Sequence, residues 1–344
     1  MIRSLTGARS KRGRWLRGGA LGAVCAVTLT AGLSAAVPAA VAATPFFEVG
    51  FLNNTGTLSL VGMVNNGASG FTIMPGTSPS LTQLSNGGYE VAFQNTTGSL
   101  ITWGPDGVLN WGAEKAGTSP SITAMPSGEY EVAYVGVDGI VDTTGDIGAE
   151  SWFAAAPGTS PSIAPIFSGE GYEVAFQGSN HNLWTVNNEG DINDHDLGML
   201  AGTSPSVTEV QGGGDEVAFQ ANTGSLWSVS SNNAVYNYNL GMLAGTSPSI
   251  TGFAGSSNYQ IAFQANTGSL WTVGKSDGSG EFNYQLGMMA GTSPSIIDDP
   301  GNGNNYEIAF QANTGILWEA FTADSGGVNT TLGMKAGTSP TLAT

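Results

Sequence analysis

Hydrophobic and polar residues alternate along the stretch that begins at Tyr259 and reads YQIAFQANTGSLWTVG. Tyr259, Ile261 and Phe263 recur at every second position, which predicts a β-strand. The Asn-Thr-Gly sequence that follows ends at Gly268, and glycine readily adopts the positive φ of a three-residue hairpin loop. Residues 269–273 are rich in β-branched and aromatic side chains and therefore predict the returning strand of a hairpin.

Two further strands complete the unit. Residues 282–289 (FNYQLGMM) predict a third strand, and a Gly-Thr-Ser-Pro turn then leads into a short strand at residues 295–297. Proline is tolerated where a strand begins because no ladder hydrogen bond is lost there. Four short strands in about 40–45 residues are typical of one blade of a β-propeller.

The same unit recurs along almost the whole chain. Its clearest marker is a Thr-Ser-Pro sequence that occurs seven times, at intervals of 41, 41, 44, 43, 46 and 46 residues. The prolines are Pro79, Pro120, Pro161, Pro205, Pro248, Pro294 and Pro340. The matching hairpins begin near Phe47, Tyr89, Tyr130, Tyr172, Asp215, Tyr259 and Tyr306. Seven copies at this period predict seven blades.

The phase of the repeat indicates how the ring closes. Residues 47–51 correspond to the second strand of a unit, whereas residues 339–343 correspond to the first strand. If the C-terminal strand completes the N-terminal blade, neither strand is left with an unpaired edge. We therefore expect one all-β domain at residues 44–344, a closed seven-bladed β-propeller with four antiparallel strands in each blade.

Residues 1–43 have the pattern of a secretory signal peptide. Six Lys and Arg residues precede an apolar segment rich in Ala and Gly, and small residues near Ala43 offer cleavage sites. The single cysteine, Cys25, lies in this segment, so the domain that follows has neither disulfides nor a thiol-based metal site. We expect the protein to be secreted and extracellular.

The domain that follows the signal segment is strongly acidic. All 26 Asp and Glu residues lie after position 43, against only three lysines and no arginine, a net charge of −23. Nucleic-acid phosphates are bound by clustered Lys and Arg, so this composition excludes nucleic acid as a partner. It also argues against binding to an anionic membrane surface.

The repeat resembles a known group of proteins. The order of a Ser-Pro-Ser-Ile strand, a YEVAFQ strand, an Asn-containing turn ending in Gly and a Leu-Trp strand is similar to that of the bacterial seven-bladed propeller lectins that bind fucose and related sugars. It is more distantly similar to the tachylectin and tectonin propellers. The resemblance covers residues 44–344 and implies a glycan as the partner.

Polar side chains of the repeat gather at one rim of such a propeller. The turn between the second and third strands and the Thr-Ser-Pro connection to the next blade lie at the same end of the sheet. Amides there can pair with sugar hydroxyls, and a nearby aromatic ring can cover the apolar face of a sugar. The amide candidates are Gln220, Asn222, Gln264, Asn266, Gln311 and Asn313. The aromatic candidates are Trp184, Trp227, Trp271 and Trp318.

Each of these patterns also has a structural interpretation. The tryptophans can fill the space between two blades, the amides can be turn chemistry, and Met199, Met242, Met288 and Met334 suit core filling. A glutamate near the start of the second strand recurs at Glu90, Glu131, Glu173, Glu216 and Glu307. We expect these glutamates to be solvated charges near the opposite rim.

Metal and catalytic sites have little support. The acidic stretch at residues 191–196 offers oxygen ligands, but it lacks the spacing of a calcium-binding EF-hand loop, and a solvated loop is the simpler interpretation. The Asn-Thr-Gly-Ser-Leu-Trp sequence resembles the Asp-box of sialidases, yet the arginines that those enzymes need are absent after residue 43. We expect no cofactor, no metal and no catalytic residues.

These observations favour a non-catalytic, lectin-like protein that binds glycans multivalently at sites between blades. Weak sites then combine, because effective concentration can raise avidity by roughly 10²–10⁴. One alternative is a scaffold for protein partners, which an apolar rim patch without pockets would support. The other is a polysaccharide hydrolase, which a single acidic pair in the central funnel would support.

Overall fold

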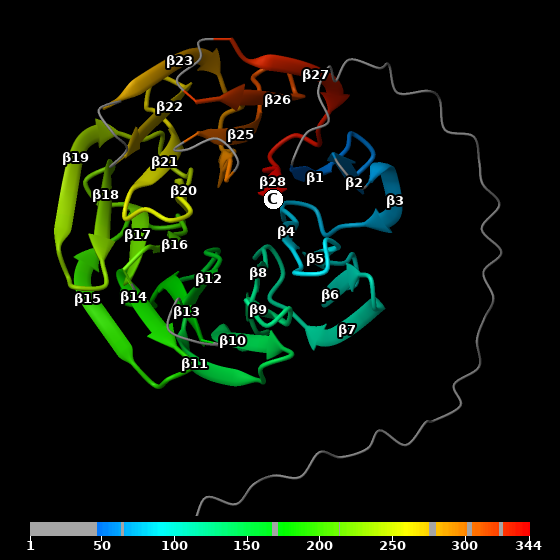
Figure 1. Cartoon of the computed structure of the whole chain (residues 1–344), viewed down its shortest axis with the longest axis horizontal. Helices are drawn as coiled ribbons and strands as arrows, with labels where there is room; N and C mark the ends of the chain where they lie inside the picture. The colour runs from blue at the N-terminus through cyan, green and yellow to red at the C-terminus, as the bar shows by residue number, and fades with distance from the viewer. Residues whose placement is uncertain are drawn as a thin grey trace, which may run out of the picture. The chain divides into compact units, whose positions relative to one another are not determined.

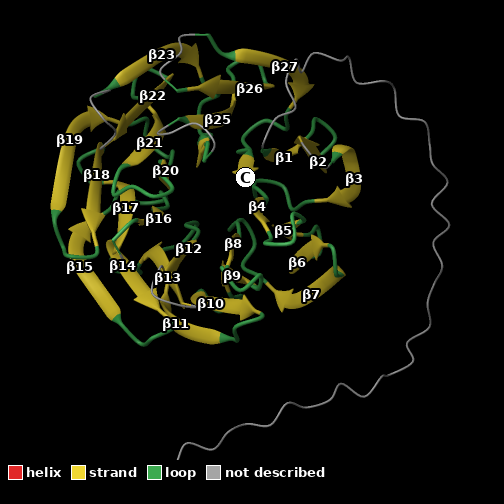
Figure 2. Ribbon diagram, viewed as in Figure 1, coloured by secondary structure: helices red, strands yellow, loops and turns green. Residues whose placement is uncertain are grey.

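The computed structural model describes residues 47–344, apart from 63–64, 167–170, 213, 275–279, 301–304 and 323–325. Within these residues the chain forms seven antiparallel sheets of four strands each. Figure 1 shows that successive sheets follow one another around a ring, and Figure 2 shows strands and loops without helices in the part described. The prediction of an all-β, seven-bladed propeller is confirmed.

The blades are numbered in the order of their second strands, and each is given from the centre outward. Blade 1 contains β28 (Thr341–Ala343), β1 (Glu48–Leu52), β2 (Thr57–Gly62) and β3 (Asn66–Thr72). Blade 2 contains β4 (Ser80–Gln83), β5 (Tyr89–Gln94), β6 (Ser99–Gly104) and β7 (Gly107–Ala113). Blade 3 contains β8 (Ser121–Ala124), β9 (Tyr130–Val135), β10 (Ile140–Gly145) and β11 (Glu150–Ala154).

The other four blades have the same layout. Blade 4 contains β12 (Ser162–Ile166), β13 (Gly171–Gln177), β14 (Asn182–Asn187) and β15 (Ile192–Gly198). Blade 5 contains β16 (Ser206–Val210), β17 (Gly214–Gln220), β18 (Ser225–Ser230) and β19 (Val235–Gly241). Blade 6 contains β20 (Ser249–Gly252), β21 (Tyr259–Gln264), β22 (Ser269–Gly274) and β23 (Phe282–Gly287). Blade 7 contains β24 (Ser295–Asp298), β25 (Tyr306–Gln311), β26 (Ile316–Phe321) and β27 (Val328–Gly333).

The C-terminal strand closes the ring. β28 pairs antiparallel with β1, with Val49 opposite Leu342 and Glu48 opposite Ala343, so the last strand completes the first blade (Figure 1). The predicted secretory signal at residues 1–43 lies outside the described residues. None of the described residues forms a helix that is long and apolar enough to cross a membrane.

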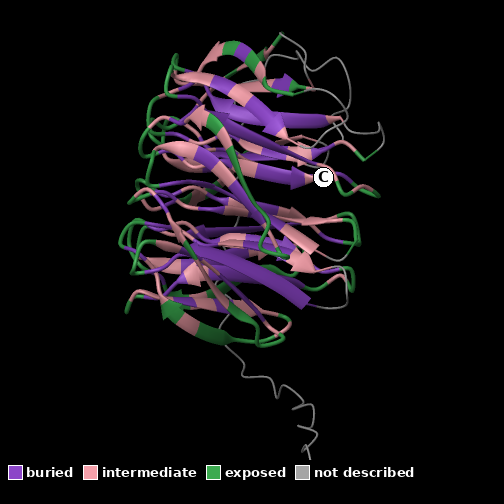
Figure 3. Cartoon of the chain, turned by 90° about the vertical axis from the view of Figure 1, so that its left-hand side faces the viewer, coloured by how far each residue is buried: buried purple, intermediate pink, exposed green. Residues whose placement is uncertain are grey.

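Both faces of each blade pack against a neighbouring blade. As a result the second strands are buried on both sides, and every residue of β5, β13, β21 and β25 is buried. Figure 3 shows that exposed residues gather in the loops at the two ends of the strands, whereas buried residues run along the strands. Seven hydrophobic clusters each combine residues of two consecutive blades, so the core lies between blades. The expected core role of the repeated methionines is confirmed, because Met199, Met242, Met288 and Met334 are buried.

The Thr-Ser-Pro sequence joins each blade to the next through its serine. The serine N–H donates to the Oγ of the equivalent serine one blade later, at 2.9–3.0 Å. The ring runs through Ser78, Ser119, Ser160, Ser204, Ser247, Ser293 and Ser339 and returns to Ser78. The preceding threonine is buried and caps its own turn, as Thr203 does by donating to the Leu200 carbonyl at 2.7 Å. The recurring motif therefore encodes the contact between blades.

A second serine, directly after the proline, caps the innermost strands. The Ser80 Oγ accepts the Ile122 N–H of the next blade at 3.1 Å, and the same bond recurs in five further blades. The free edge of an innermost strand would otherwise leave N–H donors unpaired. These hydroxyl groups satisfy the donors without adding another strand.

Among the described residues, tyrosine hydroxyls bridge four of the seven interfaces between blades. The tyrosine at the start of a second strand reaches a hydroxyl on the third strand of the preceding blade. The pairs are Thr102 with Tyr130 at 3.2 Å, Thr143 with Tyr172 at 2.8 Å, Ser228 with Tyr259 at 3.4 Å and Thr272 with Tyr306 at 3.2 Å. Phe47 and Glu319 occupy these two positions at the interface of blades 7 and 1, where the ring closes.

The prediction that the repeated glutamates are solvated is wrong. Glu90, Glu131, Glu173, Glu216 and Glu307 are all buried, with exposed fractions of 0–8%. They stand on second strands, whose two faces are both covered by neighbouring blades. Burial raises the pKa of three of these carboxyls, Glu90, Glu131 and Glu173, to about 7.

Candidate functional site

The four predicted tryptophans lie between blades, each at a different interface. Trp227 on β18 packs against the hydrophobic cluster between blades 4 and 5, Trp271 against the cluster between blades 5 and 6, and Trp318 against the cluster between blades 6 and 7. All four rings are partly buried. Within the described residues, the indole N–H groups of Trp227, Trp271 and Trp318 are buried and lack a hydrogen-bond partner. Because each belongs to its own interface, no two tryptophans share a site.

The fourth tryptophan, in blade 4, has a different environment. The Trp184 Nε1 donates to the Asn180 Oδ1 at 3.1 Å, and its ring centroid lies 5.0 Å from that of Phe153 on blade 3. The acidic stretch beside it is held by amide donors, since Asp194 accepts hydrogen bonds from Asn180 and Asn182 at 3.0 Å. Among the described residues, no group of three or more possible metal ligands is present.

The three predicted glutamines are fully buried, not exposed on the rim as the sequence suggested. Their amides donate to backbone carbonyls of the segment that leads to the next blade. The bonds join Gln220 to Met242 at 3.3 Å, Gln264 to Met288 at 3.2 Å and Gln311 to Lys335 at 3.1 Å. These amides hold the connecting segment in place, and a binding role for them stays a prediction.

The three predicted asparagines are exposed in the turns between second and third strands. Each backbone N–H donates to the last residue of the preceding blade's outer strand. The bonds join Asn222 to Gly198 at 2.9 Å, Asn266 to Gly241 at 3.0 Å and Asn313 to Gly287 at 3.0 Å. The structure therefore separates the asparagines, at the surface, from the glutamines, in the interior.

Replacing Trp271 with alanine should weaken the interface between blades 5 and 6. Full burial of a tryptophan would make truncation cost about 3–5 kcal/mol, so we expect about 2 kcal/mol for a partly buried ring. Thermal unfolding should show the loss, while calorimetry should give an unchanged number of ligand sites per folded molecule. The control is Ile101→Ala, at the equivalent position of blade 2, which should also leave the number of ligand sites per folded molecule unchanged. A lower number of sites at an unchanged melting temperature would make Trp271 part of a binding surface.

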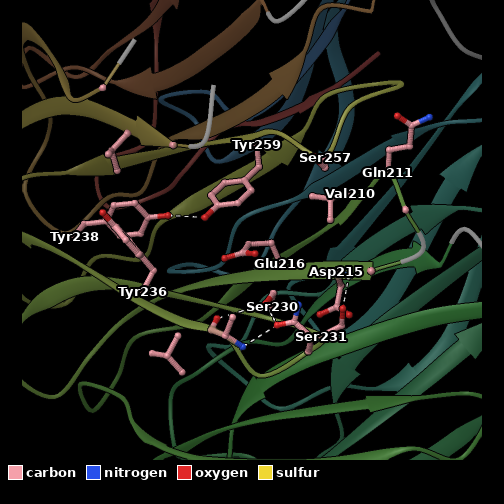
Figure 4. A pocket seen from close by; sticks show the side chains of 18 of the residues that line it. Val210, Gln211, Asp215, Glu216, Ser230, Ser231, Tyr236, Tyr238, Ser257 and Tyr259 are labelled. Atoms are coloured by element: carbon pink, nitrogen blue, oxygen red, sulfur yellow. Dashed lines mark hydrogen bonds between the residues drawn. The ribbon is translucent and has the colours of Figure 1, made fainter. Parts of the chain in front are cut away.

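A cavity of about 800 Å³ opens between blades 5 and 6, at the rim that carries the turns between first and second strands and between third and fourth strands (Figure 4). One wall comes from blade 5, through residues 210–212, 214–216, 230–232, 234–236 and 238. The other comes from blade 6 and includes Tyr259, Val273, Gly274 and Glu281. Its volume lies in the range of small-molecule sites, roughly 300–1,000 Å³. This rim is opposite the one that the sequence pattern favoured.

Three tyrosines give the cavity an aromatic wall. The Tyr238 and Tyr259 hydroxyls lie 2.8 Å apart, and both also lie near the Ser228 Oγ, at 3.2 and 3.4 Å (Figure 4). This network is partly buried, whereas Tyr236 is 60% exposed and stands edge-on to Tyr238 with ring centroids 4.8 Å apart. The bonded pair of Tyr238 and Tyr259 links the outer strand to the next blade, and the ring of Tyr236 packs on Tyr238 at the opening.

The local backbone explains how β19 positions these rings. Asn239 has a φ of 56°, and the Asn237 Oδ1 accepts its N–H at 2.8 Å. The pairing of β18 with β19 shifts register between Ser225 and Trp227, at the same point. Asparagine tolerates left-handed φ better than most residues because its side chain bonds the local backbone. The resulting bulge turns Tyr238 inward toward Ser228.

Acidic and hydroxyl groups line the rest of the cavity. Glu216 is 7% exposed and lies beside the Tyr238–Tyr259 pair in Figure 4, and Asp215 lies near Ser231, whose Oγ accepts the Asp215 N–H at 3.4 Å. Burial raises the pKa of Asp215. Burial also raises the pKa of Tyr259, and the negative charge of the neighbouring Glu216 adds to the rise.

A smaller cavity of about 210 Å³ occupies the equivalent place between blades 1 and 2. Tyr89 and Gly104 line it, and they correspond to Tyr259 and Gly274 in the repeat. Trp103 stands where the larger cavity has Val273, since Trp103 pairs with Val91 as Val273 pairs with Ile261. A tryptophan in place of a valine fills space, which accounts for part of the difference in volume.

Sequence reasoning missed Tyr236, Tyr238 and the acidic pair Asp215 and Glu216. A signal was present, because Asp215 interrupts a series of tyrosines at the start of the second strand, and VYNYN is the tyrosine-rich version of the outer strand. Both departures occur in blade 5, but the candidate residues were those shared between blades, so residues found in blade 5 alone were not considered. A binding site present in only one blade has to be sought at positions where that blade differs in sequence from the others.

No protein-family model and no curated protein matches the sequence. Among solved structures, the chain is similar to the fucose-specific lectin of Aleuria aurantia, with a TM-score of 0.55, 14% identity, and coverage of 76% of this chain and 96% of that one. It is also similar to AofleA of Arthrobotrys oligospora, with a TM-score of 0.56, 13% identity, and coverage of 81% and 94%. The chain shares the propeller fold of fucose-binding lectins.

The similarity also extends to an enzyme and to a different number of blades. A streptogramin B lyase matches with a TM-score of 0.50, 14% identity, and coverage of 82% of this chain and 86% of that one. The Aleuria lectin is described as a six-bladed propeller, whereas this chain has seven blades. At these identities the comparisons establish the fold, and the function has to be argued from the cavity.

Proposed function

We propose that this protein is a secreted, non-catalytic lectin that binds glycans in cavities between its blades, with its principal site between blades 5 and 6. The observation that carries the proposal is the supported, 60% exposed ring of Tyr236 at the mouth of a cavity of about 800 Å³. An aromatic face covers the C–H surface of a sugar, and the hydroxyl, amide and carboxyl groups around it suit sugar hydroxyls.

Two further observations support glycan binding. The smaller cavity between blades 1 and 2 occupies an equivalent position, as a protein with repeated sites requires. The Aleuria aurantia and SapL1 lectins, which share the fold, were determined with fucosides bound. Repeated weak sites on one molecule would favour polymeric or surface-bound glycans, through the effective concentration of the second site.

The scaffold alternative has weaker support. The exposed large hydrophobic side chains of the described residues are spread over several blades, mostly on outer strands, with no more than two on any one strand. Val108, Phe153, Ile192 and Val328 stand on four different blades. Scattered apolar side chains are normal on a protein surface, whereas a docking surface needs a contiguous patch.

Replacing Tyr236 with alanine should remove the principal site. A glycan array probed with residues 44–344 identifies a ligand, and calorimetry then measures its affinity and stoichiometry. An aromatic contact adds about 0.5–1.5 kcal/mol beyond the area it buries, so the affinity should fall about tenfold or more. The melting temperature should change little because the ring is mostly exposed.

Leu109 provides the matched control. It is 40% exposed and stands at the position of Tyr236 in blade 2, since Leu109 pairs with Thr102 as Tyr236 pairs with Ser228. Leu109→Ala should leave the affinity unchanged. If neither variant affects binding, or if no glycan on the array binds, the cavity between blades 5 and 6 is not the lectin site.

A further inference from the structure

The turn between β18 and β19 forms part of the wall of the cavity between blades 5 and 6. Residues 230–232 and 234–236, on either side of Asn233, line that cavity. Asn233 has a φ of 62°, and the equivalent turn of blade 4 has a glycine at this position, Gly190, with a φ of 98°. Glycine would meet this backbone requirement at a lower cost, so the backbone alone does not account for an asparagine here.

The side chain of Asn233 is bonded by blade 4. Its Oδ1 accepts a hydrogen bond from the Asn193 Nδ2 at 3.1 Å and lies 3.1 Å from the His195 Nδ1, and both of these residues stand on β15. An amide oxygen only accepts hydrogen bonds, so the His195 Nδ1 carries the proton in this contact. The Nε2 is then an acceptor and receives the Thr185 hydroxyl at 3.1 Å. The two bonds to Asn233, here called the clasp, join the outer strand of blade 4 to the cavity wall.

The clasp stands at an interface that has no tyrosine bridge. In four other interfaces a tyrosine at the start of the second strand bonds a hydroxyl group of the preceding blade. Blade 5 has Asp215 at the tyrosine position, and Thr185 has the strand position of the hydroxyl residue. Because Thr185 bonds His195 and His195 bonds Asn233 of blade 5, the histidine takes the place of the tyrosine.

Burial keeps the His195 imidazole neutral at neutral pH. It lowers the pKa of His195 below the ordinary value near 6.5, and the hydrogen bond with Asn233 and the charge of Asp194 only partly offset this. Once released into water, the same imidazole would titrate near 6.5. The released state therefore binds a proton more readily, so the clasp has its full strength above about pH 6.5 and weakens as the pH falls below that value.

A second titratable group shares the Thr185 hydroxyl. Thr185 also hydrogen-bonds the carboxyl of Glu173 on β13, and burial, followed by the charges of Asp215 and Asp191, raises the pKa of Glu173 to about 7. In acid, Glu173 and a protonated His195 would both direct a hydrogen at the Thr185 oxygen, whose own hydrogen would then lack an acceptor. Within the described residues, the charged groups that act on His195 or Glu173 are Asp191, Asp194 and Asp215.

We infer that His195 is a positioning residue for the cavity between blades 5 and 6, which holds the turn of residues 231–234 when it is neutral and releases that turn when it is protonated. Tyr236 follows the turn directly in β19, so release of the turn loosens the ring at the mouth of the cavity. The consequence for glycan binding, a lower affinity in acid, rests on the proposed lectin function. The clasp itself can be tested without a ligand.

Hydrogen exchange of the free protein tests the clasp. Protection factors, corrected for the intrinsic exchange rate at each pH, are measured at pH 7.5 and pH 5.5 for a peptide that covers residues 230–236. We expect the protection to be about two- to tenfold lower at pH 5.5, which corresponds to the loss of one hydrogen bond. The hairpin turn at residues 265–268, on the other rim of blade 6, is the internal reference and should show no such change.

Three variants locate the effect. His195→Asn keeps an amide donor near the position of Nδ1 but cannot titrate, so the protection should be the same at both pH values. His195→Ala removes the donor and should lower the protection at pH 7.5 to the acidic level. Asn233→Gly removes the acceptor at an exposed position that suits glycine, and it should do the same even if His195→Ala unfolds. The matched control is Gln285→Gly in blade 6, at a φ of 55°, which should behave as the unmodified protein does.

A glycan identified on the array then measures the consequence for binding. Its affinity for the unmodified protein should fall about two- to tenfold between pH 7.5 and pH 5.5, and its affinity for His195→Asn should not. Glu170 and Lys275, which lie outside the described residues, are the same in every variant. Differences between the variants therefore report on His195 and Asn233.

The outcomes separate this inference from the proposed function. If Asn233→Gly keeps full protection, or if His195→Asn loses protection in acid as the unmodified protein does, the inference is wrong whatever the protein binds. An affinity that stays constant while the protection falls would also overturn the positioning role of His195. If no glycan binds, the lectin proposal fails, and the exchange data alone decide whether His195 holds the turn.

Discussion

Removing residues 339–344 should unfold the propeller or make it aggregate. This segment supplies β28, and without it β1 has an unpaired edge facing the centre of the ring. Leu342 is buried in the cluster between blades 7 and 1, and Ser339 makes two bonds of the serine ring, one with Ser293 and one with Ser78. The deletion therefore removes a strand, a core side chain and the closing contact together.

We expect the melting temperature to fall by more than about 10 °C, because losing a buried leucine alone costs about 2–5 kcal/mol and the hydrogen bonds add to that loss. Size-exclusion chromatography should show aggregated material, since exposed strand edges pair with one another. Deleting Thr344 alone is the control, because β28 ends at Ala343. A truncated protein that melts within a degree or two of the full domain would show that the ring does not depend on this closure.

Raising the pH from about 5 to about 8 should destabilise the domain. Burial raises the pKa of Glu90, Glu131 and Glu173 to about 7, and that of Glu114 to about 9. An unfolded glutamate titrates near 4.3, so the folded state binds more protons than the unfolded state between these values. The stabilisation is complete below about pH 4 and is lost as the pH rises through 7 and beyond.

The interface of blades 7 and 1 should contribute most to this effect. Glu307 is 0% exposed, and within the described residues neither of its carboxyl oxygens has a hydrogen-bond partner. Burial, together with the charges of the nearby Glu319 and Asp299 carboxylates, raises its pKa to about 10. Ionising such a group places an uncompensated charge inside the interface where the ring closes.

Glu307→Gln should therefore raise the melting temperature at pH 8 and leave it nearly unchanged at pH 5. One pKa unit corresponds to about 1.4 kcal/mol, so even part of the shift gives a gain of about 2–3 kcal/mol at pH 8. Glu189→Gln, at an exposed position, controls for the general effect of removing one negative charge. Equal changes in the two variants at both pH values would mean that burial of Glu307 has no consequence for stability.

The architecture could be predicted because it depends on features that every blade repeats. Alternating residues such as Tyr259, Ile261 and Phe263 form a second strand in each unit, and the spacing of the Thr-Ser-Pro sequences sets the number of blades. The phase of the repeat gave the closure between β28 and β1. The function of the serine in that motif, by contrast, depends on a neighbour some 41–46 residues away and could be seen only in the structure.

The burial of polar residues could not be predicted by the same reasoning. A polar residue at every second position usually means a strand with one face in water. Glu90 and Glu131 stand near the start of their strands, and on that ground they are predicted to be solvated at the rim. In a propeller both faces of the second strand are covered, so the same alternation places glutamates and glutamines between blades. Hydropathy alone does not distinguish a strand in water from one between two sheets.

The candidate site was the least predictable part for a related reason. The amides and tryptophans were predicted as site residues because they recur in several blades. In this structure the recurring residues serve the packing and hydrogen bonding between blades. Gln264 is an example, since its amide supports a connecting segment. Tyr236 and Asp215 have no equivalents of the same type in most blades, and both line the cavity between blades 5 and 6.

The serine ring also gives the molecule a direction along its circumference. Every serine donates its N–H to the blade ahead and accepts from the blade behind, and the bond from Ser339 to Ser78 has the same sense as the other six. Each blade thus meets its neighbours through the same pair of bonds wherever it stands in the chain. Duplicating or removing a whole blade would therefore keep the direction of every serine-to-serine hydrogen bond. Opening the chain at another connecting segment would keep it as well. Inserting part of a blade would not. The blade is in this sense the smallest exchangeable module of the protein.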